Sequence, residues 1–213
     1  MRPQLPRCLT HRPSSEVHLK LSLTLDTNCI VDVDENRRSA DYVRSLADEN
    51  KGGIADVAVV AISASEVQPG KRLLTNFSDF ESRLADLNLG HSGILLPMAY
   101  LDVTFFDKCL FAGDDEIALE HAIHEILFPG FPFDTAKILG DEKALRSWRN
   151  KKCDVQAFWA HLHGKRDIFV TSDDNFLNSK KPRLEALGSK STKIMRPNEA
   201  AEYVLRVSGT GAN

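Results

Sequence analysis

The sequence lacks an apolar run of the roughly 18 or more residues that a membrane-spanning helix needs. Its start, MRPQLPRCLTHRPSS, also lacks the apolar stretch of a secretory signal. Cysteine is scarce: there are four in 213 residues, none spaced C-x-x-C as in a zinc ribbon or a redox pair. These absences predict a protein of the cytoplasm with no membrane partner and with reduced cysteines.

A strong net charge is missing as well, because 27 Lys and Arg residues nearly balance 30 Asp and Glu residues. The balance hides two opposed blocks. Residues 21–142 carry nine basic and 22 acidic side chains, whereas residues 143–213 carry 14 basic and seven acidic ones. A basic final third favours an anionic partner, or an acidic site that needs cations.

Short apolar runs alternate with helical patterns along the chain. Buried strands are expected at 19–25, 55–63 and 167–171, with an edge strand at 193–197 and an extended piece around 94–106. Helical spacing is found after Ser39, at 77–89, at 114–128, from about 141, at 153–162, and from a cap at Asn198 to Val204. Strands separated by helices favour an α/β fold with a parallel central sheet and helices on both faces.

Four acidic side chains accompany the expected strands, in the region where open α/β sheets bind ligands. They are Asp26 after the first strand, Glu66 after the second, Asp173 after the third, and Asp154 near the start of the helix at 153–162. Two unit charges about 4 Å apart repel by roughly 4 kcal/mol at an effective dielectric of about 20, so four converging carboxylates need protons or metal ions. Carboxylates without soft ligands suit Mg²⁺ or Mn²⁺.

Five parts of the sequence together resemble the PIN domain family of metal-dependent ribonucleases. They are LTLDTNCIVD (23–32), Glu66, CDVQAFWAHL (153–162), DIFVTSDDNF (167–176) and IMRPNEAAEYV (194–204). The resemblance covers residues 20–66 and 150–205. Residues 67–150 are longer than in the compact bacterial toxins of that family and do not align with them.

This resemblance implies a three-layer PIN-like fold in a single domain, residues 18–206, with an enlarged and mainly helical region at 67–150. The Pro- and Arg-containing start of the sequence itself predicts a flexible leader at residues 1–17, and the ending SGTGAN predicts a tail at residues 207–213. The implied activity is a divalent-metal-dependent endoribonuclease, in which a metal-activated water hydrolyses phosphodiester bonds of single-stranded RNA. The products would carry 5′-phosphate and 3′-hydroxyl ends.

The resemblance also implies roles for particular residues. One or two Mg²⁺ or Mn²⁺ ions would be held by Asp26, Glu66, Asp154 and Asp173. Asn28 and Thr171 would orient these carboxylates, with Asp174 and Asn175 as auxiliaries. Because adjacent side chains of an extended strand point in opposite directions, we expect only Asp173 of the Asp173–Asp174 pair to join the site.

Basic side chains flank the last two acids. Arg149, Lys151 and Lys152 precede Asp154, while Lys180 and Lys181 follow Asp173. These five could contact a phosphate backbone leading to the site. The alternative is that they form ordinary solvated helix faces.

Two other functions stay open. One is a catalytically inactive PIN-like module that binds RNA or a protein partner. The other is a haloacid-dehalogenase-like phosphatase, which needs D-x-D after the first strand, where this chain has Asn28 in the second acidic position. A homodimer, or an inhibitory or scaffold protein, is compatible with the long 67–150 region. The spacing of His121 and His124 places both on the wet face of their helix, away from metal chemistry.

Overall fold

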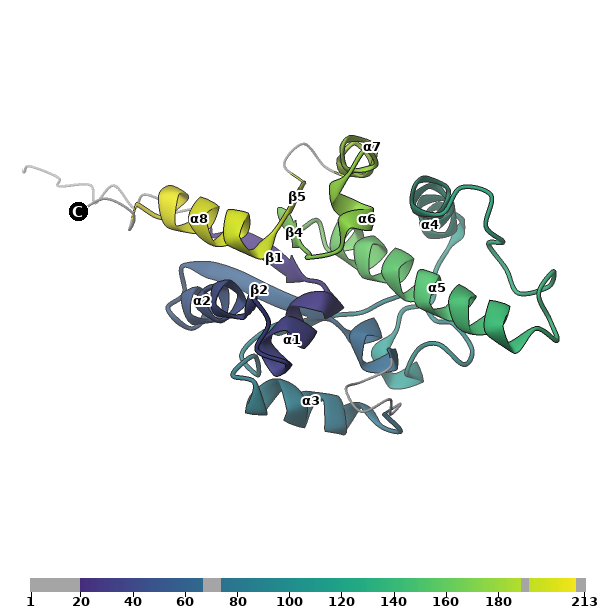
Figure 1. The fold of residues 1–213 in the computed structure, drawn as a ribbon, viewed down its shortest axis with the longest axis horizontal. Helices are drawn as coiled ribbons and strands as arrows, with labels where there is room; N and C mark the ends of the chain where they lie inside the picture. The colour runs from purple at the N-terminus through teal and green to yellow at the C-terminus, as the bar shows by residue number, and fades with distance from the viewer. Residues whose placement is uncertain (1–19, 67–73, 189–191, 210–213) are drawn as a thin grey trace, which may run out of the picture.

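The computed structural model describes residues 20–66, 74–188 and 192–209. It contains a fully parallel five-stranded sheet flanked by helices (Figure 1). The strands are β1 (Leu21–Leu25), β2 (Ala55–Val60), β3 (Gly93–Leu95), β4 (Ile168–Val170) and β5 (Lys193–Met195). Their order in the sheet is β3-β2-β1-β4-β5, with β1 at the centre. The predicted α/β class with a parallel central sheet is therefore confirmed.

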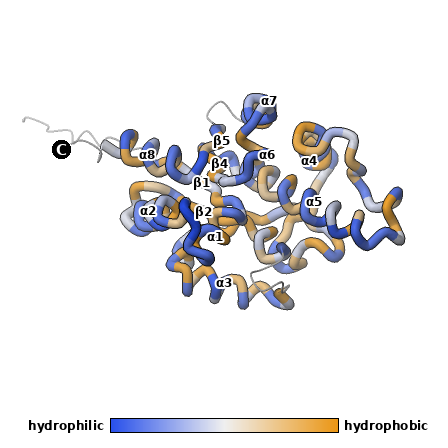
Figure 2. The backbone as a smooth tube through the Cα atoms, viewed as in Figure 1, coloured by the Kyte–Doolittle hydropathy of each residue, from blue (hydrophilic) through white to orange (hydrophobic). Residues whose placement is uncertain are grey.

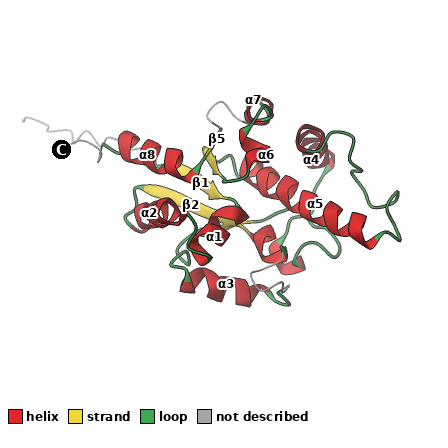
Figure 3. Cartoon of the chain, in the orientation of Figure 1, coloured by secondary structure: helices red, strands yellow, loops and turns green. Residues whose placement is uncertain are grey.

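Eight α-helices and two 3-10 helices lie between or after the strands in the described residues. They are α1 (Thr27–Asp34), α2 (Ala40–Lys51), η1 (Ala61–Ser65), α3 (Phe77–Asp86), η2 (Phe106–Lys108), α4 (Asp114–Leu127), α5 (Glu142–His163), α6 (Asp174–Leu177), α7 (Lys181–Glu185) and α8 (Pro197–Val207). Figure 3 shows how the strands lie between the helices. No described helix is both long and apolar enough to cross a membrane.

Apolar side chains leave the sheet on both faces and form two cores. Leu23 and Leu25 of β1 pack in one core together with α1, α2, α3 and α8. Phe169 of β4 points to the other face and packs with α4, α5 and α7. A parallel sheet covered on both sides needs strands that are apolar almost throughout, as these are. In Figure 2 the helices instead alternate between hydrophobic and hydrophilic stretches.

The expected strands are all present, with shifted ends. β2 stops at Val60, because the rest of the predicted run, Ala61–Ser65, coils into η1. The extended piece expected at 94–106 is a strand only at Gly93–Leu95. The last helix begins at Pro197 with Arg196 as its N-cap, rather than at Asn198, because proline suits the first helical position.

Two predictions about the helices were wrong. The helix from about 141 and the helix at 153–162 are one helix, α5, since neither Gly nor Pro interrupts residues 142–163. Asp154 therefore lies midway along α5 and not near its start. His124 is buried, with Nε2 2.9 Å from the carbonyl oxygen of Phe131, so it does not face water.

The predicted leader, residues 1–17, lies outside the described residues. The same holds for 67–73 in the enlarged region and for 210–213 in the predicted tail. Within 74–150, α3 and α4 confirm the helices predicted at 77–89 and 114–128.

Candidate active site

Asp26 lies where the neighbouring strands β1 and β4 end. Its backbone N–H donates to the carbonyl of Val170, the last residue of β4, over 2.9 Å. One carboxylate oxygen caps α1 by accepting from the N–H of Thr27 (2.8 Å), and the other accepts from the hydroxyl of Thr171 (2.6 Å). Both strands thus fix the position of this buried carboxyl.

Glu66 is brought beside Asp26 by the turn that η1 makes after β2. Its Oε1 lies 2.5 Å from the hydroxyl oxygen of Thr27, which is also 2.7 Å from Ser63 Oγ. Sequence reasoning missed Thr27 as part of the site. Its place directly after Asp26, in the first turn of the helix that Asp26 caps, is the signal that could have found it.

Asp173 follows β4 and caps the short helix α6 by accepting from the N–H of Asn175 (2.8 Å). Its own N–H donates to the hydroxyl oxygen of Thr171 over 3.0 Å. Thr171 therefore connects the backbone of Asp173 to the carboxyl of Asp26. This is the geometry that its predicted orienting role requires, whereas Asn28 makes a longer contact, 3.5 Å, with Asp26.

Asp32 is a second residue that sequence reasoning missed. It is buried on α1 and accepts a hydrogen bond from the hydroxyl of Ser172 over 2.6 Å. Because Ser172 lies between Thr171 and Asp173, this bond ties α1 to the turn that carries Asp173. Asp32 occurs four residues after Asn28, and this i,i+4 spacing places both on one face of α1.

Asp154 joins the other three acids from α5, which packs against η1. Arg149, five residues earlier on α5, donates from Nη2 to the carbonyl of Ser65 over 3.2 Å. Burial raises the pKa of Asp154 well above its usual value, and the charges of Glu66, Asp26 and Asp173 raise it further. The four acids predicted to converge therefore lie within electrostatic reach of one another.

The pKa values of Glu66 and Asp26 are raised as well. Burial raises the pKa of Glu66 from 4.5 to about 8, opposed by the hydrogen bond with Thr27 and reinforced by the charges of Asp26 and Asp173. Burial also raises the pKa of Asp26 from 3.8 to about 6, opposed mainly by the hydrogen bond from Thr171. Near neutral pH the carboxyl of Glu66 therefore holds a proton that a cation could replace.

The donor set fits a hard divalent cation. Carboxylate oxygens are the ligands that Mg²⁺ and Mn²⁺ favour, and the hydroxyls of Thr27 and Thr171 fix the orientation of two of the carboxyls. As the side chains are oriented, no three His, Cys, Asp or Glu residues of the described ranges are arranged to hold one ion.

The two predicted auxiliaries point elsewhere. Asp174 is 81% exposed and pairs with Arg196 over 2.5 Å. Asn175 accepts a hydrogen bond from the ammonium group of Lys180. Of the adjacent acids, Asp173 is the one whose charge acts on the cluster, as the sequence predicts.

Basic residues from both predicted groups meet around the ring of Phe128. The ammonium nitrogen of Lys151 lies 5.4 Å from the ring centroid, and that of Lys180 lies 5.8 Å from it. Lys151 also lowers the pKa of Asp154 and therefore lies near the acids. Lys181 is partly exposed, with its ammonium 3.9 Å from Glu185.

Lys152 does not suit its predicted contact with a phosphate backbone. Its side chain is only 1% exposed, and the ammonium donates to Glu120 over 2.8 Å. It lies on the face of α5 that packs against α4. A lysine that contacts solvent or RNA would instead lie on an exposed face. We therefore assign it a structural position and leave it out of the phosphate contacts.

Comparison with known proteins adds no assignment: the chain matches no family model, no curated protein and no solved structure.

Proposed function

We propose that the chain is a divalent-metal-dependent endoribonuclease that hydrolyses phosphodiester bonds of single-stranded RNA. One observation carries the proposal. Four acids, which follow β1, η1 and β4 or lie on α5, are within electrostatic reach of one another, and burial with mutual repulsion raises the pKa of three of them. Such perturbed carboxyls are typical of catalytic and ion-binding sites.

Asp26, Glu66, Asp154 and Asp173 would hold one or two Mg²⁺ or Mn²⁺ ions. When bound, these ions supply Lewis-acid activation of water and charge neutralisation at the scissile phosphate. The chain's own contribution is orientation. Thr171 holds Asp26, and Thr27 holds Glu66, so that their carboxylates stay on the same edge of the sheet.

The substrate class follows from the charges beside the acids. Lys151 and Lys180 are partly exposed and flank Phe128, and Lys151 also acts on the charge of Asp154, so a phosphate backbone would meet positive charge there. Together with Arg149 on α5 and Lys181 at the start of α7, these two lysines form the basic border. An acidic centre with a basic border suits a polyanion whose cleaved phosphate is neutralised by bound cations.

The test is cleavage of a fluorescent single-stranded RNA by the purified protein in Mg²⁺ or Mn²⁺, with EDTA as the blank. We expect products with 5′-phosphate and 3′-hydroxyl ends, lost in EDTA and in Asp26→Asn. Asp48→Asn makes the same change at an exposed position of α2 and should cleave like the wild type. Equal cleavage by Asp26→Asn and wild type would sink the proposal, and RNA binding without cleavage would favour the inactive module.

A further inference from the structure

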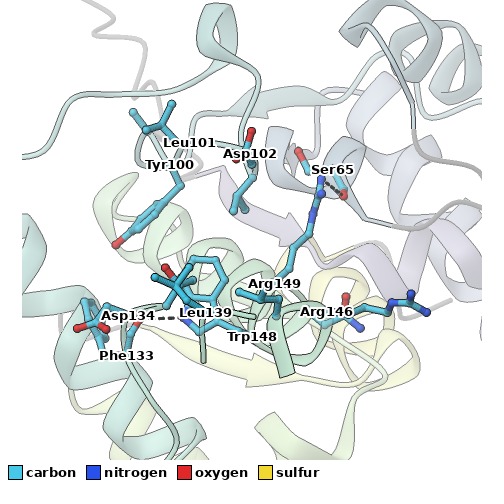
Figure 4. A pocket seen from close by; sticks show the side chains of 15 residues that line it. Ser65, Tyr100, Leu101, Asp102, Phe133, Asp134, Leu139, Arg146, Trp148 and Arg149 are labelled. Atoms are coloured by element: carbon cyan, nitrogen blue, oxygen red, sulfur yellow. Dashed lines mark hydrogen bonds between the residues drawn. The ribbon is translucent and has the colours of Figure 1, made fainter. Parts of the chain in front are cut away.

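A large cavity lies between residues 99–103, residues 133–139 and the first half of α5 (Figure 4). Its volume is about 1190 Å³. Pockets for small ligands usually enclose roughly 300–1,000 Å³, so this cavity has room for a nucleotide. The metal chemistry proposed above assigns no role to this cavity.

Aromatic rings form much of the cavity wall. Tyr100 comes from the loop, Phe133 from the segment before α5, and Trp148 from α5 itself. The rings of Tyr100 and Trp148 meet edge to face, with centroids 6.4 Å apart. The ammonium of Lys152 lies over all three rings, 3.8 Å from the centroid of Phe133, 4.6 Å from that of Tyr100 and 5.4 Å from that of Trp148. Phe133 also has His121 stacked on it at 3.4 Å, so Tyr100 and Trp148 are the better platforms for a ligand.

The wall is held rigidly from behind. Trp148 donates from its indole N–H to the carbonyl of Phe133 over 3.0 Å. Tyr100 donates to Glu120 over 2.5 Å, and the same carboxylate accepts from Lys152. Groups already fixed in place lose little conformational entropy when a ligand binds. The buried Lys152 thus belongs to the support of this wall.

Charge at the cavity matches a nucleotide. Arg146 and Arg149 line it from successive turns of α5. The buried Nε of Arg149 has no hydrogen-bond partner among the described residues. Two exposed acids, Asp102 and Asp134, also line the cavity, and carboxylates accept hydrogen bonds from the amino groups of bases. The cavity thus offers arginines to bind phosphate, rings to stack on a base and acceptors for the amino groups of a base, which are the groups that a nucleotide needs.

The cavity borders the segment that carries Glu66. Ser65 lines it and immediately precedes Glu66. A second cavity of about 180 Å³ also includes Ser65, Asp102 and Arg149 in its lining, so the two hollows share a border at the end of η1. An RNA bound in the large cavity would therefore lie against the residue that precedes Glu66.

We propose that this cavity holds an unpaired base of the RNA whose phosphodiester bond is presented to the four acids. The inference rests on the proposed function for the identity of the polymer. An apolar protein segment would use the rings but would leave Arg146 and Arg149 without anionic partners. Stacking of bases on aromatic rings is tolerant of sequence, which suits a single-stranded substrate.

The experiment compares two probes that carry the same number of phosphates. One is a fluorescein-labelled octauridylate, and the other is an octamer of abasic spacers with the same label. Binding is measured by anisotropy in EDTA, where cleavage is absent. Because the phosphate contribution is equal, any difference reports on the bases. We expect the octauridylate to bind roughly tenfold more tightly.

Intrinsic fluorescence gives a second readout. The chain has two tryptophans, and Trp159 is fully buried, so quenching on RNA binding should come from Trp148. Trp148→Leu should bring the affinity for both probes to the same value, and Trp148→Phe should keep most of the difference. Phe111→Leu is the matched control, since Phe111 is 91% exposed and is not among the residues that line the cavity.

Equal wild-type affinity for both probes, without quenching of Trp148, would overturn the inference. So would a dimer in sedimentation experiments that Trp148→Leu dissociates, because a second copy would then occupy the cavity. Cleavage in Mg²⁺ is scored separately. Cleavage with base-independent binding would overturn only this inference, whereas base-dependent binding without cleavage would support it and remove the nuclease proposal.

Discussion

The protein buries carboxyl groups in two places and treats them differently. Glu120, on α4, is fully buried and accepts from Lys152, Gln156 and Tyr100. The acid cluster instead gathers Asp26, Glu66, Asp154 and Asp173, and burial together with the charges of neighbouring acids raises the pKa of the first three. The negative charge of Glu120 is therefore compensated by a cation of the chain itself, Lys152.

The difference separates structure from function. A buried acid with an internal cation and satisfied hydrogen bonds needs nothing from outside the protein. A group of acids that repel one another lacks such an internal cation, and a cation from solution can compensate its charge.

Removing one charge from the cluster should cost the most activity. Asp154→Asn keeps the shape of the side chain but should lower RNA cleavage by at least about 100-fold, since even supporting residues of metal sites cost up to that much. The rate is measured in Mg²⁺ at matched protein concentration. Glu120→Gln, the same type of change in the compensated region, should cleave at nearly the wild-type rate per folded molecule. Equal losses in both variants would erase the comparison.

Removing the internal cation should cost the most stability. Lys152→Met leaves Glu120 buried without its ion pair, and we expect the free energy of unfolding to fall by about 3–5 kcal/mol. Urea denaturation measures it. The double variant Lys152→Met, Glu120→Leu should recover much of the loss, because no buried charge remains. A double variant as unstable as the single one would contradict a compensated pair.

The cluster should make stability depend on pH. Asp26 and Glu66 have folded-state pKa values of about 6 and about 8, above their ordinary 3.8 and 4.5. The folded state therefore binds protons more tightly than the unfolded chain. The resulting stability is fully present below pH 4 and is lost as the pH rises through 6 to 8.

In EDTA the melting temperature should thus fall by a few degrees between about pH 5 and about pH 8. Mg²⁺ or Mn²⁺ should reduce this fall, because a bound cation replaces the protons. The double variant Asp26→Asn, Glu66→Gln should show a flatter profile with no response to the cation. An identical fall in that variant would place its origin outside the cluster.

The smallest effect concerns the basic border. Lys151→Ala or Lys180→Ala should weaken RNA binding a few-fold and lower the slope of log affinity against log salt by about one. Anisotropy titrations in EDTA at several salt concentrations measure this. Arg206→Ala, on α8, is the charge-matched control and should leave the slope unchanged. A slope that responds equally to all three variants would mean nonspecific attraction.

Local patterns were sufficient to predict the elements that meet the sheet directly. The alternation of Leu21, Leu23 and Leu25 predicts β1, and the strand's end predicts the place of Asp26. Parallel pairing then brings Thr171 to its side, because Leu25 and Val170 are in register. These features depend on neighbours in sequence and on a rule common to parallel sheets.

The remaining features could not be predicted from the sequence, because they depend on which face of a helix packs against a segment that is distant in sequence. Lys152 and Glu120 have the residue types of surface positions, and only the packing of α4 on α5 buries both. His124 was misplaced for the same reason, since its contact is with Phe131 in the loop after α4. The aromatic cavity likewise joins Tyr100 and Trp148, which no periodic pattern connects.

The continuity of α5 has a consequence for where an RNA would be cut. Trp148 and Asp154 are six residues apart in one uninterrupted helix, which gives a separation of about 9 Å along its axis. Helix geometry fixes both this rise and the angle between the two side chains, so a base resting on Trp148 and a phosphate beside Asp154 would keep one relative position in every complex. Cleavage positions would then stand at a constant offset from the base in the cavity, and any base preference would appear in the products at that one position.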